Sequence, residues 1–225
     1  MRNELHPRGL EIVTVALDTA GADAARPWIE AARPEHPSLI DSGHVIDELL
    51  GVVNVPTGVW IDEGGMIVRP AEPAWPGHTP VLDMMDDLPI PPAASAVRDE
   101  IKRMHINPER YLAMIQDWVA NGAASQYALS AEEVIARSQP RSPDTARAAA
   151  HFELGQHLHR HGDHDAAVDH WRQAHRLDPA NWTYKRQAWN LETGDTVTQS
   201  SAYEGSWLAD VQAIGAEHYY PEIQP

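Results

Sequence analysis

Histidines are the most concentrated chemistry-bearing side chains in this sequence. Six of them lie between residues 157 and 175: His157, His159, His161, His164, His170 and His175. His157 and His161 are four residues apart, so on a helix they share one face and could hold a metal ion. No acidic residue or cysteine completes that ligand set. We therefore interpret the six as surface histidines beside a helix–helix turn, which charge below about pH 6.5, and we assign no metal and no cofactor.

Other groups that could do chemistry are scarce. The chain has no cysteine, which excludes disulfides, thiolate nucleophiles and thiolate metal ligands within it. There is no Gly-x-Ser-x-Gly elbow, no phosphate-binding glycine loop and no His-Glu-x-x-His motif. Asp83, Asp86 and Asp87 form an acidic cluster, for which a solvated face is a better interpretation than acid–base catalysis. We identify no catalytic residue in this chain.

A proline stands among β-branched residues in the segment GVVNVPTGVWIDEGGMIVR, Gly51–Arg69. Because proline cannot donate to a sheet ladder, Pro56 belongs at the entrance of a strand. Thr57–Ile61 is strand-like, the next four residues supply a turn, and Met66–Val68 forms a second apolar run. The segment predicts a β-hairpin entered through proline.

Length and charge narrow the class of protein. With 225 residues the chain can form one large domain or two small ones. Its formal charge of −16 disfavours nucleic acid as a partner. No apolar run approaches the roughly 20 residues of a membrane span, and no signal peptide opens the chain. We therefore expect a cytoplasmic protein that binds neither membrane nor nucleic acid.

Strands and helices alternate before the hairpin. Leu10–Asp18 is a β-branched run typical of a strand buried on both faces. Ala22–Ala32 predicts a helix, with Pro27 in its first turn. The segment PSLID, Pro37–Asp41, predicts a short strand, and HVIDELLG, His44–Gly51, a short helix ended by glycine. The order predicts a mixed α/β layer.

Residues 1–70 resemble thioredoxin-fold redoxins of the thiol-disulfide oxidoreductase and peroxiredoxin-like type. The resemblance is carried by GLEIVTVALD, PSLID and VIDELLGVVNVPTGVWIDEGGMIVR, in that order. It implies an α/β thioredoxin-like domain in which Val55, Pro56 and Thr57 form a cis-proline loop that positions the substrate. It also implies that the strands Leu10–Leu17 and Thr57–Ile61 belong to one sheet.

The same resemblance implies parts that these residues do not contain, namely a first strand and a Cys-x-x-Cys motif. We therefore expect the natural protein to extend upstream of Met1, with cysteine or selenocysteine in that motif. Without the strand, two apolar strand edges lack a hydrogen-bonding partner. We expect such a chain to self-associate, as a homo-oligomer, or to expose apolar surface.

The remainder of the chain predicts an all-α, TPR-like domain at residues 95–195. It follows a Pro-rich linker or covering loop at 71–94, packed through Trp75 and the pair Met84-Met85. Asn107-Pro108 predicts a helix start, and Ser130 with Glu133 predicts a capping box. The helices should fold independently of the redoxin-like part.

Residues 148–181 have the spacing of a tetratricopeptide repeat (TPR), a pair of antiparallel helices. The residues expected to pack the pair are Leu154, Gly155, Leu158, Ala167, Trp171, Ala174 and Pro179. Since one repeat cannot bury its own faces, neighbouring helices must cover it. The aromatic tail at 196–225 is expected to strap across the helices or, as the less favoured alternative, across the hairpin.

Two classes of function follow. The first is the C-terminal part of a redoxin-family oxidoreductase whose nucleophile lies upstream of Met1. The second is a non-catalytic interaction module, in which the helical repeat binds a protein or peptide partner and the redoxin-like part is a scaffold. The chain by itself is predicted to be inactive in thiol chemistry.

Overall fold

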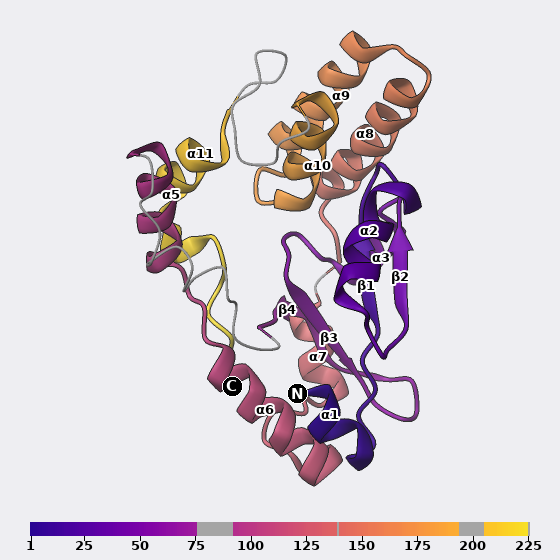
Figure 1. The fold of residues 1–225 in the computed structure, drawn as a ribbon, viewed down its shortest axis with the longest axis vertical. Helices are drawn as coiled ribbons and strands as arrows, with labels where there is room; N and C mark the ends of the chain where they lie inside the picture. The colour runs from indigo at the N-terminus through magenta and orange to yellow at the C-terminus, as the bar shows by residue number, and fades with distance from the viewer. Residues whose placement is uncertain (76–91, 139, 194–204, 225) are drawn as a thin grey trace.

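The computed structural model describes residues 1–75, 92–138, 140–193 and 205–224 (Figure 1). In chain order the elements are α1 (Arg2–Leu5), β1 (Thr14–Leu17), α2 (Ala22–Ala32), β2 (Ser38–Asp41), α3 (Val45–Leu50), β3 (Thr57–Ile61), β4 (Ile67–Pro73), α5 (Pro92–Arg103), α6 (Pro108–Asn121), α7 (Ala131–Arg137), α8 (Pro143–Arg160), α9 (His164–Leu177), α10 (Trp182–Thr193) and α11 (Trp207–Ile214). The helices α8 to α10 lie at one end of the molecule and α6 at the other, with the strands between them. The acidic cluster and the Met84-Met85 pair fall outside the described residues.

In the part of the chain that the structure describes, the strands form two separate two-stranded sheets. β1 pairs with β2 in parallel, with Thr14 opposite Ser38, and β3 pairs with β4 as an antiparallel hairpin. The prediction that Leu10–Leu17 and Thr57–Ile61 share one sheet is therefore wrong. Among the described residues no strand lies between β1 and β3, so the backbone ladder has nothing through which to continue.

The first strand is shorter and more exposed than predicted. Only Thr14–Leu17 is regular, and Val13 is 54% exposed, so burial on both faces is also wrong. A two-stranded sheet offers little surface to cover apolar side chains. Large apolar side chains are exposed on the neighbouring elements as well: Trp28, Leu39, Val45 and Leu49. This part of the chain exposes apolar surface, as the open strand edges led us to expect.

Local helix signals agree well with the structure. The Asn107 side chain accepts a hydrogen bond from the backbone N–H of Arg110, and both halves of the Ser130–Glu133 capping box are formed. α3 ends at Gly51, whose positive φ of 73° suits glycine. One detail is wrong: Pro27 lies in the interior of α2 rather than in its first turn. The exposed helix tolerates it because water can reach the backbone carbonyl that Pro27 leaves without a donor.

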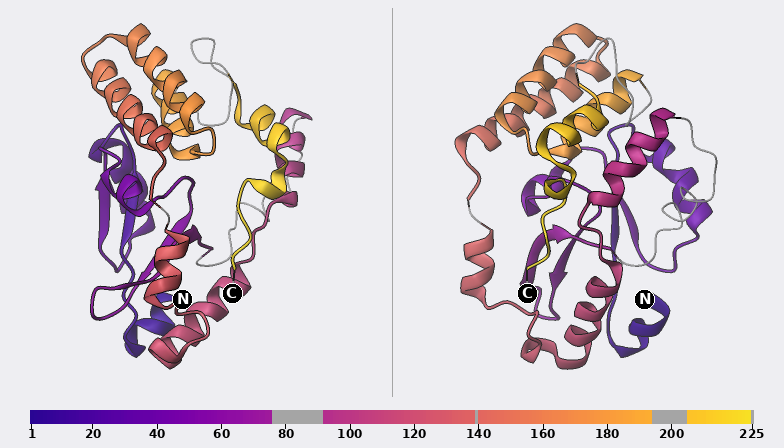
Figure 2. Two further views of the ribbon diagram at one scale, coloured as in Figure 1. Left: turned by 180° about the vertical axis from the view of Figure 1, so that it is seen from behind. Right: turned by 90° about the vertical axis from the view of Figure 1, so that its left-hand side faces the viewer.

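The hairpin packs on helices from beyond the Pro-rich segment. The Trp60 indole donates a hydrogen bond of 3.1 Å to the Tyr111 hydroxyl and stacks on Trp118 with ring centroids 5.0 Å apart. Leu129 N–H donates to the Val68 carbonyl. These contacts join both sides of the boundary expected between the redoxin-like and helical parts. Figure 2 shows α6 and α7 beside the hairpin, away from α8 to α10.

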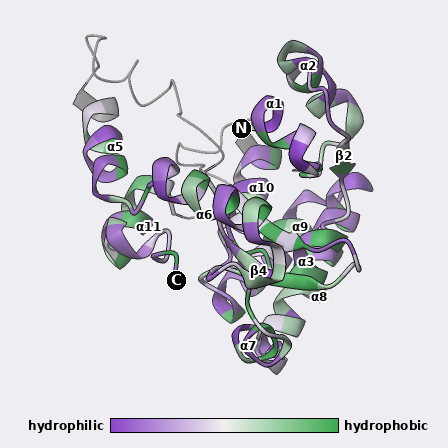
Figure 3. Cartoon of the chain, turned by 90° about the horizontal axis from the view of Figure 1, so that it is seen from below, coloured by the Kyte–Doolittle hydropathy of each residue, from purple (hydrophilic) through white to green (hydrophobic). Residues whose placement is uncertain are grey.

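Hydrophobic residues gather where the elements meet. In Figure 3 green segments lie around β4, α8 and α9, whereas α5 is mostly purple. One continuous set of buried side chains runs from Leu5 through Trp60 and Met114 to Trp171 and Trp189. None of the described helices is long and apolar enough to cross a bilayer.

Candidate functional site

The two helices of the repeat, α8 and α9, approach closely at Gly155. A Cβ added there would lie 2.5 Å from Trp171 Nε1 and 2.6 Å from Trp171 Cδ1. Trp171, Ala167 and Ala174 have no exposed surface, and Leu158 is partly buried against them. Small residues opposite one large ring therefore hold the pair together.

Two of the expected packing residues lie elsewhere. Leu154 is 42% exposed, because it is one position before Gly155 and so points about 100° away from the α9 side of α8. Pro179 is exposed and follows the end of α9 at Leu177, so it can mark the helix end but does not pack the pair. Their packing role is corrected accordingly.

A third helix and part of the α/β region cover one side of the repeat. Phe152 on α8 stacks on Tyr184 of α10 with ring centroids 4.1 Å apart. The His44 ring contacts Phe152 edge-on at 5.1 Å, and its Nδ1 lies 2.6 Å from the Asp47 carboxylate, both side chains being buried. Burial first, and the Asp47 charge second, raise the pKa of the Tyr184 hydroxyl. The start of α3 is thus docked against α8 and α10.

The opposite side of α8 is not covered by any other described element. Its exposed residues include Ala146, Ala150, Leu154 and His157, which recur at helical spacing and form one stripe. We call this stripe the α8 face. Alanines at positions 146 and 150 would let another helix approach closely.

One feature of the loop before β3 agrees with what the redoxin resemblance implies. The Val55–Pro56 peptide bond is cis. Val55 N–H donates to its neighbour's side chain, Asn54 Oδ1, and the Val55 carbonyl accepts 2.7 Å from the Tyr220 hydroxyl. The Thr57 hydroxyl donates to the Asn54 carbonyl. The backbone groups of Val55 are therefore already paired within the chain.

The C-terminal tail supplies the donor to the Val55 carbonyl and makes further contacts around this loop. Asn54 Nδ2 donates to the Tyr219 carbonyl, and Tyr219 packs edge-on against Trp182 with ring centroids 4.7 Å apart. Trp75 is buried and meets Tyr220 at 4.9 Å. The described part of the tail thus packs on both the hairpin and the helices, rather than on one of them.

A pocket of about 490 Å³ lies beside this loop. Its lining includes Val53, Thr57, Trp182, Tyr219 and Pro221. Desolvation is the main cause that raises the pKa of the Tyr220 hydroxyl, so this group is neutral and can only donate or accept hydrogen bonds. Most of the lining is apolar or aromatic, but it also includes His218 and Glu72, whose carboxylate is paired with Arg69.

The histidines of the repeat differ in environment. His157 and His161 are both exposed, with ring centroids 4.2 Å apart, and His161 Nδ1 lies 2.7 Å from the His157 backbone carbonyl. His175 is not a surface group: burial and then the nearby Lys185 charge lower its pKa to about 3. The expectation of six surface histidines is wrong at this position, which faces the core because α10 covers it.

The comparisons with known proteins agree with the helical part of the prediction. The sequence model of the tetratricopeptide repeat family matches residues 148–181. No curated protein and no solved structure matches the chain. The chain therefore contains a tetratricopeptide repeat formed by α8 and α9, within a region that is helical on both sides of it.

Sequence reasoning missed the partners of the loop before Pro56. Asn54, Trp182, Tyr219 and Tyr220 come together from three distant segments. The density of tyrosine and tryptophan in the tail was the available signal, but it could not identify which loop the tail would contact.

Proposed function

We propose that this chain is a protein-interaction protein whose tetratricopeptide repeat binds an amphipathic helix of a partner protein along the α8 face. The repeat at 148–181 supports an interaction role, because helical repeats stack one helix pair on the next and so offer faces that accept a further helix. The observation that carries the proposal is the exposed α8 face, in which Ala146, Ala150 and Leu154 form an apolar strip that ends at His157.

The two sides of the repeat differ in accessibility. On one side Phe152 is buried against α10 and the start of α3, and Gln156, about one turn further along α8, is buried as well. On the α8 face, in contrast, Leu154 is 42% exposed, and the alanines beside it leave room for the side chains of an incoming helix. The partner class that fits is an amphipathic helix with apolar residues at i, i+3, i+4 and i+7.

Selection from a displayed library of helical peptides about four turns long tests this proposal. Peptides with the amphipathic pattern should be enriched, and A150E, which places a charge on the stripe, should weaken their binding about tenfold or more. Q173E, on an exposed position of α9, is the matched control and should change the affinity little. Absence of such peptides, or equal loss in both variants, would contradict the proposal.

The order of the elements supports a second candidate, a redoxin-type lobe that acts with residues outside this chain. The parallel pair β1–β2, the helices α2 and α3, and the hairpin β3–β4 follow the order that the redoxin resemblance implies. β1 and β3 each have a single partner strand among the described residues, so a further strand could join them. Val55, Pro56 and Thr57 would then position a substrate once the Tyr220 contact opens.

Translation of the DNA upstream of the Met1 codon, through any in-frame stop codon, tests this second candidate. A strand followed by a motif with cysteine or selenocysteine is expected. The extended chain should then reduce insulin disulfides, whereas the 225-residue chain, which has no thiol, should not exceed the reductant alone. No such segment in any frame, or an inactive extended chain, would refute the redoxin assignment and leave the interaction proposal standing.

A further inference from the structure

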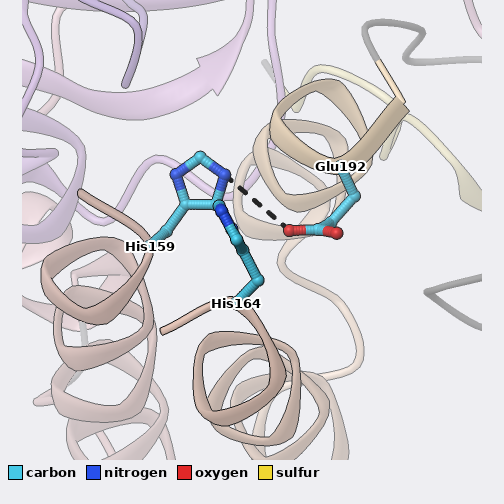
Figure 4. A group of neighbouring side chains, drawn as sticks. All are labelled: His159, His164 and Glu192. Carbon is cyan, nitrogen blue, oxygen red and sulfur yellow. Dashed lines mark ion pairs between the residues drawn. The ribbon is translucent and has the colours of Figure 1, made fainter. Parts of the chain in front are cut away.

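Three side chains from three successive helices converge near the turn that joins α8 to α9. His159 lies near the end of α8, His164 begins α9, and Glu192 lies near the end of α10 (Figure 4). One ligand atom from each residue lies within 4.8 Å of the other two. The His159 and His164 rings meet edge-on with centroids 4.7 Å apart, and His159 Nε2 is 3.8 Å from Glu192 Oε1.

The carboxylate in this group is unusual. The Glu192 side chain is only 11% exposed, and its Oε1 atom is buried with no hydrogen-bond donor among the described residues. A buried carboxylate oxygen without a donor is costly, so such an atom calls for a cationic partner. The imidazole at 3.8 Å is too far away to donate a normal hydrogen bond.

We propose that His159, His164 and Glu192 form a binding site for zinc or a similar divalent transition metal. Two imidazoles and one carboxylate are a common ligand set for such ions, and a fourth position would remain for water or a partner side chain. Ligand atoms about 2.1 Å from a tetrahedral ion are about 3.4 Å apart, so small side-chain rotations would close this cluster around one. This site goes beyond the proposed interaction role and does not depend on it.

Binding there would tie the turn between α8 and α9 to the end of α10. These helices come from parts of the chain that separate on unfolding, so an ion held by all three stabilises the folded state by mass action. The pair His157 and His161 has no comparable geometry: both side chains are exposed, and no third ligand joins them among the described residues.

Zinc titration of the full chain, purified without a polyhistidine tag and treated with a chelator, tests the proposal. One zinc ion per chain is expected, measured by competition with a coloured chelator. Cobalt(II) should give the visible absorption of a tetrahedral site. H164A and E192Q should each weaken binding about tenfold or more, whereas the double variant H157Q/H161Q, the matched control, should stay within about twofold of the parent.

Thermal unfolding provides the second readout. Zinc should raise the unfolding midpoint of the parent and of H157Q/H161Q but not of E192Q. Since His164 is exposed, H164A leaves the fold intact and keeps the test valid if E192Q unfolds. The proposal is overturned if the parent binds no zinc, or if H157Q/H161Q loses binding while H164A retains it.

Discussion

Replacing Arg69 with methionine is expected to destabilise the protein by about 3–5 kcal/mol, the usual penalty for breaking a buried ion pair. Arg69 has no exposed surface and is paired with the Glu72 carboxylate through two hydrogen bonds of 2.6 and 2.9 Å. It also donates to the backbone carbonyls of Tyr127 and Gln224. The substitution would remove the charged partner of the Glu72 carboxylate and one donor from each of the two carbonyls.

The effect should extend beyond the strand that carries Arg69. This one guanidinium joins β4, the segment before α7 and the C-terminal tail, and it lies 5.4 Å from the Trp60 ring centroid. Urea unfolding measures the free-energy change. The matched control is R110M, since Arg110 makes an exposed pair with Glu222 that should contribute less than about 1 kcal/mol.

A second variant separates the loss of the Arg69 hydrogen bonds from the cost of leaving the Glu72 carboxylate unpaired. The double variant R69M/E72Q should recover part of the stability that R69M loses, because no buried carboxylate then remains unpaired. If R69M is as stable as R110M, Arg69 does not join these three segments in solution.

Gly155→Ala is the second substitution with a large expected effect, a net loss of about 1–2 kcal/mol. Alanine gains up to about 1 kcal/mol over glycine in a helix interior. The added methyl group, however, would lie 2.5 Å from Trp171 Nε1, and Trp171 is fully buried and cannot move aside. Overpacking of this kind costs about 1–3 kcal/mol and occasionally more, so it outweighs the gain in propensity.

A double-mutant cycle checks that Trp171 causes the loss. W171F removes the indole nitrogen that the new methyl group would meet. G155A should therefore destabilise the W171F background less than it destabilises the parent. Equal losses in both backgrounds, or a G155A protein more stable than the parent, would show that α8 and α9 do not meet at this contact.

Structural features that depend on a few neighbouring residues could be predicted from the sequence. The Asn107 cap, the Ser130–Glu133 capping box and the glycine end of α3 each involve positions within a turn or two of one another. The tetratricopeptide repeat was readable for a related reason: Gly155, Ala167 and Trp171 follow a fixed spacing along one helix pair. In each case one local geometry satisfies the backbone or the packing, so residue type and spacing suffice.

Clusters of side chains that come from distant segments could not be predicted in the same way. His159 and Glu192 lie on α8 and α10, and attention to i,i+4 spacing selected His157 and His161 instead. The repeat period of about 34 residues could have pointed to Glu192. One period before Glu192 is the position next to His159, near the end of α8, and successive repeats stack side by side. No sequence period relates Arg69 to its buried partners, or Tyr220 to Val55.

The sequence by itself determined the order of strands and helices, the helix ends and the tetratricopeptide repeat, because these follow from residue types at short range. Only the tertiary structure decided that β1 and β3 lie in separate sheets, that the tail covers the loop before Pro56, and that His159, His164 and Glu192 meet. The pairing of strand edges and the partners of buried polar atoms depend on packing among segments that are remote in sequence, and short-range residue spacing does not determine that packing.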